Sequence, residues 1–160
     1  EFVKPITDLI TKKYKVIHYT KLKSKDINQS EKIILTGTSL KNNEYLKQYK
    51  RFLWIKNSKK PILGICAGMH IMGKLFNSRL IKNKEIGIIS VKQINVHRFF
   101  NNIKEVYSLH NFSISLPRQF NCYLKSKKSV QAIKHQSKEI YGVLFHPEVL
   151  NKELIIKFTE

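Results

Sequence analysis

Apolar side chains recur along the chain with two different spacings, and each spacing predicts one kind of element. Recurrence every three or four positions gives a helix one apolar face, whereas alternation or a short apolar run indicates a strand. The helical spacing covers 2–13, 43–56, 67–76 and 152–160. The strand patterns cover 14–19, 32–36, 61–66, 87–94, 106–110, 121–125, 130–134 and 140–146.

The order of these elements predicts an α/β fold. In the first half of the chain helices and strands alternate, which is typical of a mainly parallel sheet with helices on both faces, a three-layer α/β/α arrangement. The second half consists mostly of short strands and ends in a helix. No repeat, linker or boundary interrupts the pattern, so we expect residues 1–160 to form a single domain.

The parallel strands also predict where functional groups meet. In such sheets these groups gather at the carboxyl ends of the strands. Gly37 follows the strand at 32–36, and Cys66 ends the strand at 61–66. We therefore expect these two residues to be neighbours in space.

Composition narrows the functional classes. The chain is 42% hydrophobic and can fill a core, but no apolar run reaches the length of a membrane span. Lys and Arg exceed Asp and Glu by 30 − 11 = 19, and these positive residues are spread along the whole chain. Without an arginine-rich arm, this charge favours an anionic substrate or an acidic partner over nucleic acid. Cys66 and Cys122 form no CxxC pair, so we expect no metal site, no disulfide and a cytoplasmic location.

Cys66 lies in the stretch with the most specific chemistry. A buried strand follows Pro61, Gly64 and Gly68 flank the cysteine, and a helical pattern comes next. A strand, a sharp turn and a helix are the geometry of a nucleophile elbow. The amino end of the helix would favour a thiolate there. The same residues also suit a structural cysteine, since free cysteines are often buried.

A cysteine nucleophile needs a base, and the base needs an orienting group. His146 ends the strand at 140–146, and Glu148 follows across Pro147. If His146 directs one ring nitrogen at Cys66, Glu148 can hold the other nitrogen and stabilise the imidazolium. By itself, His-Pro-Glu is also typical of a surface loop after a strand.

Together these motifs resemble the class I (triad) glutamine amidotransferases. The family pattern G-x-C-x-G is matched at 64–68, and G-V-Q-F-H-P-E is matched at 142–148 except that Leu144 replaces the glutamine. The strand before Gly37 is similar to the one that ends in the family's oxyanion loop. The resemblance implies a flavodoxin-like fold that opens with a core strand. This chain begins in what reads as the first helix, so we expect that strand to be missing or the sheet to be one strand short.

The resemblance also implies an activity, the hydrolysis of L-glutamine to glutamate and ammonia through a γ-glutamyl thioester. It assigns three sets of residues by their match to the family's motifs. The implied catalytic residues are Cys66, His146 and Glu148. The implied oxyanion hole uses backbone amides at Gly37, Thr38 and Ala67. The implied substrate-binding residues are His70, Leu109 and His110.

Within the family, the stretches 116–120, 131–135 and 140–149 are most similar to the separate glutaminase subunit of archaeal-type GMP synthetase. This implies that ammonia passes to a separate ATP-dependent synthetase subunit for GMP synthesis from XMP. ATP and Mg²⁺ would belong to that partner, and we expect no cofactor in this chain. The glutaminase subunits of anthranilate synthase and imidazole glycerol phosphate synthase share the triad and remain as alternatives.

Departures from the family pattern keep another alternative open. His70 stands where the family commonly has glutamine, and Leu109 replaces the serine before His110. Thr38 and Ser39 replace a glycine and a proline of the oxyanion loop, and a β-branched residue is poorly suited to a positive φ angle. A degenerate homologue that binds a partner or ligand without turnover is therefore a competing interpretation.

Overall fold

A six-stranded sheet forms the centre of the molecule, which a computed structural model describes over residues 2–160. In spatial order its strands are β1 (Ile33–Leu35), β2 (Ile62–Ile65), β8 (Ile140–Val143), β7 (Val130–His135), β6 (Phe120–Lys125) and β4 (Lys92–Gln93). β1, β2 and β8 run parallel to one another. β7, β6 and β4 extend the sheet beyond β8 as antiparallel neighbours.

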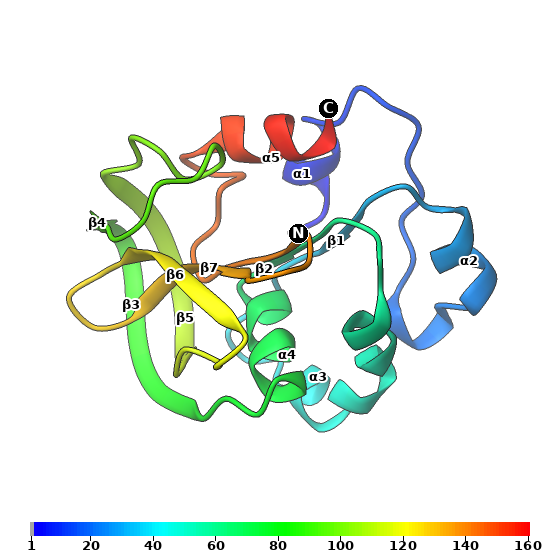
Figure 1. The fold of residues 1–160 in the computed structure, drawn as a ribbon, viewed down its shortest axis with the longest axis horizontal. Coiled ribbons are helices and arrows are strands. Elements are labelled where there is room, and N and C mark those ends of the chain that lie inside the picture. The colour runs from blue at the N-terminus through cyan, green and yellow to red at the C-terminus, as the bar shows by residue number, and fades with distance from the viewer. Residues whose placement is uncertain (1) are drawn as a thin grey trace.

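Helices cover both faces of this sheet (Figure 1). α4 (Ala67–Leu75), α3 (Glu44–Lys47) and a 3₁₀ helix over Tyr49–Asn57 pack on one face. α1 (Lys4–Thr7) and α5 (Lys152–Thr159) pack on the other face, and α2 (Ser24–Gln29) lies to the side of β1. The predicted three-layer α/β fold is confirmed, and its parallel strands β1, β2 and β8 form one side of the sheet.

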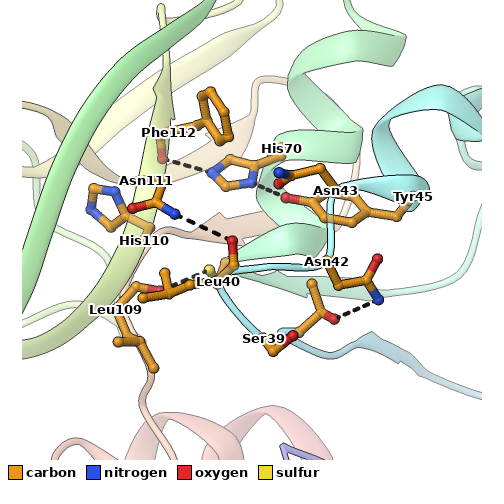
Figure 2. A pocket seen from close by; sticks show the side chains of 12 residues that line it. Ser39, Leu40, Asn42, Asn43, Tyr45, His70, Leu109, His110, Asn111 and Phe112 are labelled. Carbon is orange, nitrogen blue, oxygen red and sulfur yellow. Dashed lines mark hydrogen bonds between the residues drawn. The ribbon is translucent and has the colours of Figure 1, made fainter.

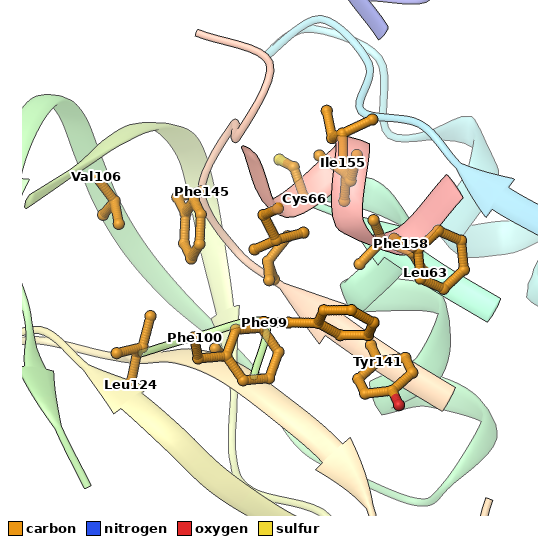
Figure 3. Close-up of a cluster of buried hydrophobic side chains, with 14 of the residues drawn as sticks. Leu63, Cys66, Phe99, Phe100, Val106, Leu124, Tyr141, Phe145, Ile155 and Phe158 are labelled. Atoms are coloured by element: carbon orange, nitrogen blue, oxygen red, sulfur yellow. The ribbon is translucent and has the colours of Figure 1, made fainter. Parts of the chain in front are cut away.

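The core is divided by the sheet into two clusters, and strand alternation assigns each residue to one of them. On β2, Leu63 and Ile65 face α1 and α5, whereas Ile62 faces α4. Figure 3 shows the first cluster, in which Leu63 and Tyr141 of the strands lie near Ile155 and Phe158 of α5. Because both faces of β2 and β8 are covered, these strands read as continuous apolar runs in the sequence.

A separate two-stranded sheet lies beside the central one. It pairs β3 (Leu80–Ser90) with β5 (Glu105–Ile114) in antiparallel register, with an irregularity between Lys82 and Glu85. The strands predicted at 87–94 and 106–110 are therefore longer or divided differently in the structure. Residues 87–90 of the first belong to β3, and residues 92–93 form β4.

Two predictions in the N-terminal part are wrong in extent or type. Of the helix predicted over 2–13, only Lys4–Thr7 is helical. The strand predicted over 14–19 is irregular chain up to a short 3₁₀ helix that starts at Tyr19 (Tyr19–Lys21). Tyr14 and Val16 are 53% and 57% exposed, so the apolar residues that suggested a strand have no sheet to join. A strand is stable only when it pairs and buries a face, which this segment does not do.

One further element differs from the sequence-based expectation. The helix predicted over 43–56 is divided into α3 and a 3₁₀ helix, which still places Tyr45 and Phe52 in the core. Within residues 2–160 no strand precedes β1 along the chain.

Candidate active site

Cys66 occupies the turn between β2 and α4 with a strained backbone. Its φ and ψ angles are 49° and −98°, outside the regions that non-glycine residues favour. Its N–H donates to the Val143 carbonyl at 2.8 Å, and its carbonyl accepts from the His70 N–H at 3.0 Å. These bonds hold the turn between the sheet and the helix. The result is the strand–turn–helix geometry of a nucleophile elbow, with the thiol at the amino end of α4.

Gly37 lies against both Cys66 and His146, which confirms that the two parallel strands bring their ends together. A Cβ atom placed on Gly37 would lie 2.7 Å from Cε1 of His146 and 3.6 Å from Cβ of Cys66. The only glycine with a positive φ among the described residues is Gly87. Gly37 is therefore required for the space it leaves to the histidine ring, and its backbone conformation is ordinary.

His146 and Glu148 form a buried pair just beyond β8. Nδ1 of His146 donates to Oε1 of Glu148 at 2.7 Å, and the residues are 1% and 4% exposed. Nε2 of His146 is buried and makes no hydrogen bond with any residue in 2–160. Burial lowers the pKa of His146, but interactions with Cys66 and Glu148 outweigh burial and raise it to about 10. The ring is thus favoured as an imidazolium beside the cysteine.

Strand β5 supplies the wall that faces the thiol (Figure 2). The Cys66 Sγ donates to the Leu109 carbonyl at 3.6 Å, and the His146 N–H donates to the Tyr107 carbonyl at 2.8 Å. The thiol and the loop of the histidine are therefore both held against this strand. Leu109 participates through its backbone, so the replacement of the family's serine leaves this contact in place.

The loop after β1 differs from what its sequence suggested. Non-glycine residues with positive φ in 2–160 are Cys66, Asn77 and Asn102, so Thr38 is not forced into that region. The side chain of Asn42 donates to Thr38 Oγ1 at 3.1 Å and stabilises the loop. Thr38 lines a small pocket together with Cys66, and Ala67 begins α4 directly after the cysteine. The β-branched residue is accommodated because the loop takes a course that needs no left-handed residue.

His110 lies on the same pocket wall, and behind it is a polar cluster that the motifs did not reveal. Nδ1 of His110 is 3.0 Å from the Asn83 carbonyl, and its Nε2 is 3.2 Å from the buried Glu85 carboxylate. Burial lowers the pKa of His110, although Glu85 acts in the opposite direction. The Glu85 carboxylate accepts hydrogen bonds from three side chains, those of Ser126, Ser129 and Gln131.

His70 also lines the pocket, but both of its ring nitrogens are bonded within the protein. Nδ1 lies 2.8 Å from the Tyr45 hydroxyl, and Nε2 lies 2.8 Å from the Phe112 carbonyl. Tyr45 and Phe112 were not identified from the sequence, where both read as ordinary apolar positions. No local pattern signals them, because their contacts to His70 span 25 and 42 positions.

The described residues form neither a metal-binding cluster nor a membrane-spanning helix. No group of three or more His, Cys, Asp or Glu side chains in 2–160 is arranged to hold a metal ion. In the same range, no helix has the length and apolar character needed to cross a bilayer.

Comparison with known proteins identifies related sequences. The sequence model of the family described as "Glutamine amidotransferase class-I" matches residues 8–157. A GMP synthase [glutamine-hydrolyzing] from Borreliella burgdorferi is 35% identical over 146 residues, which are 85% of this chain and 28% of the relative. A subunit of the GMP synthase [glutamine-hydrolyzing] from Pyrococcus abyssi is 29% identical over 140 residues, covering 81% of this chain and 71% of that protein. The chain thus spans less than a third of the Borreliella protein and most of the Pyrococcus protein.

A solved structure shares the fold. The crystal structure of a protein from Thermoplasma acidophilum, provisionally assigned as one subunit of a GMP synthase, superposes with a TM-score of 0.77 at 26% identity. The match covers 85% of this chain and 74% of that one. A glutamine amidotransferase from Thermotoga maritima has a TM-score of 0.65 at 18% identity, a likeness of fold alone.

Proposed function

Because the chain belongs to the class I glutamine amidotransferase family, we propose that it is a glutaminase that hydrolyses L-glutamine through Cys66, His146 and Glu148. The observation that carries the proposal is that three features lie together, the first two of them against Gly37. They are a strained cysteine at a helix amino terminus, a buried histidine with a free Nε2, and a carboxylate 2.7 Å from its other nitrogen. Nucleophile, base and orienting group are the parts that acyl transfer requires.

In the proposed reaction, the Cys66 sulfur attacks the side-chain amide carbon of glutamine. His146, which already carries the proton as an imidazolium, gives it to the leaving nitrogen, so that ammonia departs and a γ-glutamyl thioester forms. Water, deprotonated by His146, then cleaves the thioester and restores the thiolate. The backbone amides of Ala67 and the Gly37–Thr38 loop would stabilise each oxyanion, and losing one such donor typically costs about a hundredfold or more in rate.

The proposed destination of the ammonia is a separate ATP-dependent synthetase chain that makes GMP from XMP. Support comes from the archaeal relatives, whose names describe them as single subunits of GMP synthase. ATP and Mg²⁺ would be bound by that partner. An anthranilate synthase or imidazole glycerol phosphate synthase partner would use the same chemistry at Cys66, so the acceptor is tested separately from the glutaminase step.

The glutaminase is tested by ammonia release from L-glutamine, measured on this chain together with the synthetase subunit copurified from its own host. Cys66→Ala should abolish release, whereas Cys122→Ala, which changes the other cysteine, should leave it unchanged. A chloroketone analogue of glutamine should alkylate Cys66, and glutamine should protect it. No ammonia release from the intact complex, or release that survives Cys66→Ala, contradicts the proposal.

The small size of the pocket favours a second candidate function, binding of a partner without turnover. The cavity beside Cys66 has a volume of about 20 Å³, room for one water molecule, and His70 has no free ring nitrogen to offer a ligand. A homologue that binds its partner without turnover would have such a site. Partner binding by both the wild type and Cys66→Ala, with no ammonia release and no alkylation by the glutamine analogue, would support this candidate.

A further inference from the structure

The pocket beside Cys66 is bounded by a segment that begins in the oxyanion loop at Thr38 and continues to Tyr45. Its walls are formed on one side by strand β5 and on the other by residues 38–45 (Figure 2). The cavity has a volume of about 20 Å³, which is enough for one water molecule. The side chain of glutamine needs far more room than this. A substrate of that size can reach the thiol only if one of these walls moves.

Tyr45 joins the two walls through His70. The ring of His70 is 2% exposed, and burial lowers its pKa to about 4, so the imidazole is neutral at pH 7. The Phe112 carbonyl can only accept a hydrogen bond, so the proton is on Nε2 and Nδ1 must accept. Burial raises the pKa of Tyr45, which keeps its hydroxyl protonated and able to donate to Nδ1. The three groups therefore form one continuous chain of donors and acceptors across the pocket.

A second hydrogen bond joins the same two walls nearer the thiol. The side-chain amide of Asn111 on β5 donates to the Leu40 carbonyl at 3.2 Å (Figure 2). β5 is an extended strand paired along its length with β3, whereas segment 38–45 consists of a loop and the start of the four-residue helix α3. Of the two walls, the loop has fewer backbone bonds to break and is the one that can move.

We propose that Tyr45 is the gate residue of the Cys66 pocket, and that its hydrogen bond to His70 holds segment 38–45 closed over the thiol until it breaks to admit substrate. Tyr45 acts through His70 and the segment it anchors, so it is a positioning residue. The identity of the substrate as glutamine rests on the function proposed above, whereas the gate itself is a property of this chain's own contacts.

The test measures access to the thiol and needs no turnover. Iodoacetamide is reacted with the protein, and alkylation of Cys66 and Cys122 is followed separately by mass spectrometry. Tyr45→Phe keeps the ring and removes the hydroxyl that donates to His70. Loss of a typical neutral hydrogen bond shifts the equilibrium between the closed and open positions of segment 38–45 about fivefold toward the open one. Cys66 should therefore be alkylated about fivefold faster than in the wild type, and the rate at Cys122 should not change.

The matched control is Tyr49→Phe, which removes a hydroxyl that makes no hydrogen bond to a side chain or carbonyl in 2–160. In Tyr49→Phe, iodoacetamide should alkylate Cys66 at the wild-type rate. Asn111→Ala removes the second bond across the pocket and should also accelerate labelling of Cys66, which keeps the test open should Tyr45→Phe not fold. General destabilisation would accelerate both cysteines, so the ratio of the two rates separates gating from loss of structure.

Thermal unfolding first establishes that Tyr45→Phe and Asn111→Ala are folded. The proposal is overturned if iodoacetamide then alkylates Cys66 in both variants at the wild-type rate. It is also overturned if both cysteines accelerate equally. If Cys66 labels faster in Tyr45→Phe but no form of the complex releases ammonia, the gate stands and the glutaminase function fails. If the complex releases ammonia but the alkylation rate of Cys66 does not change in the variants, the glutaminase function stands and the gate fails.

Discussion

At the scale of single residues, the site depends on a cysteine held in an unfavourable backbone conformation. Cys66 has φ 49° and ψ −98°, and a residue in such a region costs about 1–3 kcal/mol that the surrounding structure must supply. Hydrogen bonds to Val143 and His70 on either side of the turn impose this conformation. The strain directs the thiol away from the sheet and toward His146 and β5.

This strain predicts an order of stability between two variants at position 66. Cys66→Ala removes the thiol but keeps a Cβ atom, so the strain remains, whereas Cys66→Gly removes it. We expect the free energy of unfolding of Cys66→Gly to exceed that of Cys66→Ala by about 1 kcal/mol or more. Urea unfolding of the two proteins measures the difference, and each serves as the other's control for the lost sulfur. A Cys66→Ala protein as stable as Cys66→Gly would show that the turn is not strained.

At the scale of elements, α4 lies unusually close to the strands beneath it. Eight of its nine residues are buried, and glycines on both partners allow the approach. A Cβ atom on Gly64 of β2 would lie 2.7 Å from the Gly68 carbonyl carbon, and one on Gly68 would lie 2.7 Å from the Leu35 carbonyl oxygen. This close contact places the amino end of the helix at the carboxyl ends of β1 and β2, where Cys66 and Gly37 meet.

Gly68→Ala tests this contact, because two effects of opposite sign compete. Alanine favours a helix over glycine by about 1 kcal/mol, but the added methyl group meets backbone, which cannot turn aside as a flexible side chain can. We expect the clash to dominate and lower the free energy of unfolding by about 1–3 kcal/mol. Chemical denaturation measures this free energy of unfolding, and Lys152→Ala, at the exposed start of α5, is the control for a substitution to alanine that meets no backbone. A stabilised Gly68→Ala protein would show that α4 can move away from β1 at little cost.

At the scale of the whole molecule, positive charge is abundant and little of it is neutralised internally. The sequence has 30 Lys and Arg against 11 Asp and Glu. Within residues 2–160 five ion pairs involve a lysine, and four of those five lysines are largely exposed. Exposed pairs of this kind contribute little to stability. Repulsion among the remaining positive side chains therefore opposes folding, and salt weakens that repulsion.

This repulsion predicts that sodium chloride stabilises the protein. Raising the salt from about 0.01 M to about 0.15 M shortens the screening length from about 30 Å to about 8 Å. We expect the thermal unfolding midpoint to rise by about 2–4 °C, equivalent to about 1 kcal/mol. A variant with glutamine in place of six exposed lysines should show a weaker dependence, namely at Lys41, Lys59, Lys84, Lys104, Lys127 and Lys152. A midpoint that is constant or falls with salt contradicts this prediction.

The sequence by itself was sufficient for the fold class and for the parts of the site that lie in short motifs. The apolar runs at 61–66 and 140–146 indicated buried parallel strands, because strands covered on both faces lose their polar positions. Cys66 and Gly37 were expected to meet because parallel strands end at the same edge. The His146 and Glu148 pair follows from residues only two positions apart, a spacing that local geometry can satisfy. The roles assigned to these residues stay predictions until the experiments above are done.

The tertiary structure alone decided the features that depend on contacts between distant parts of the chain. The apolar residues at 14–19 matched a strand, but none of the strands within residues 2–160 pairs with them. Thr38 looked unsuitable for the oxyanion loop, yet the course of that loop requires no positive φ. His70 is held by Tyr45 and by the Phe112 carbonyl across 25 and 42 positions, and such contacts arise only when helix, loop and strand pack together. For the same reason, the closed pocket around Cys66 has no signature in the sequence.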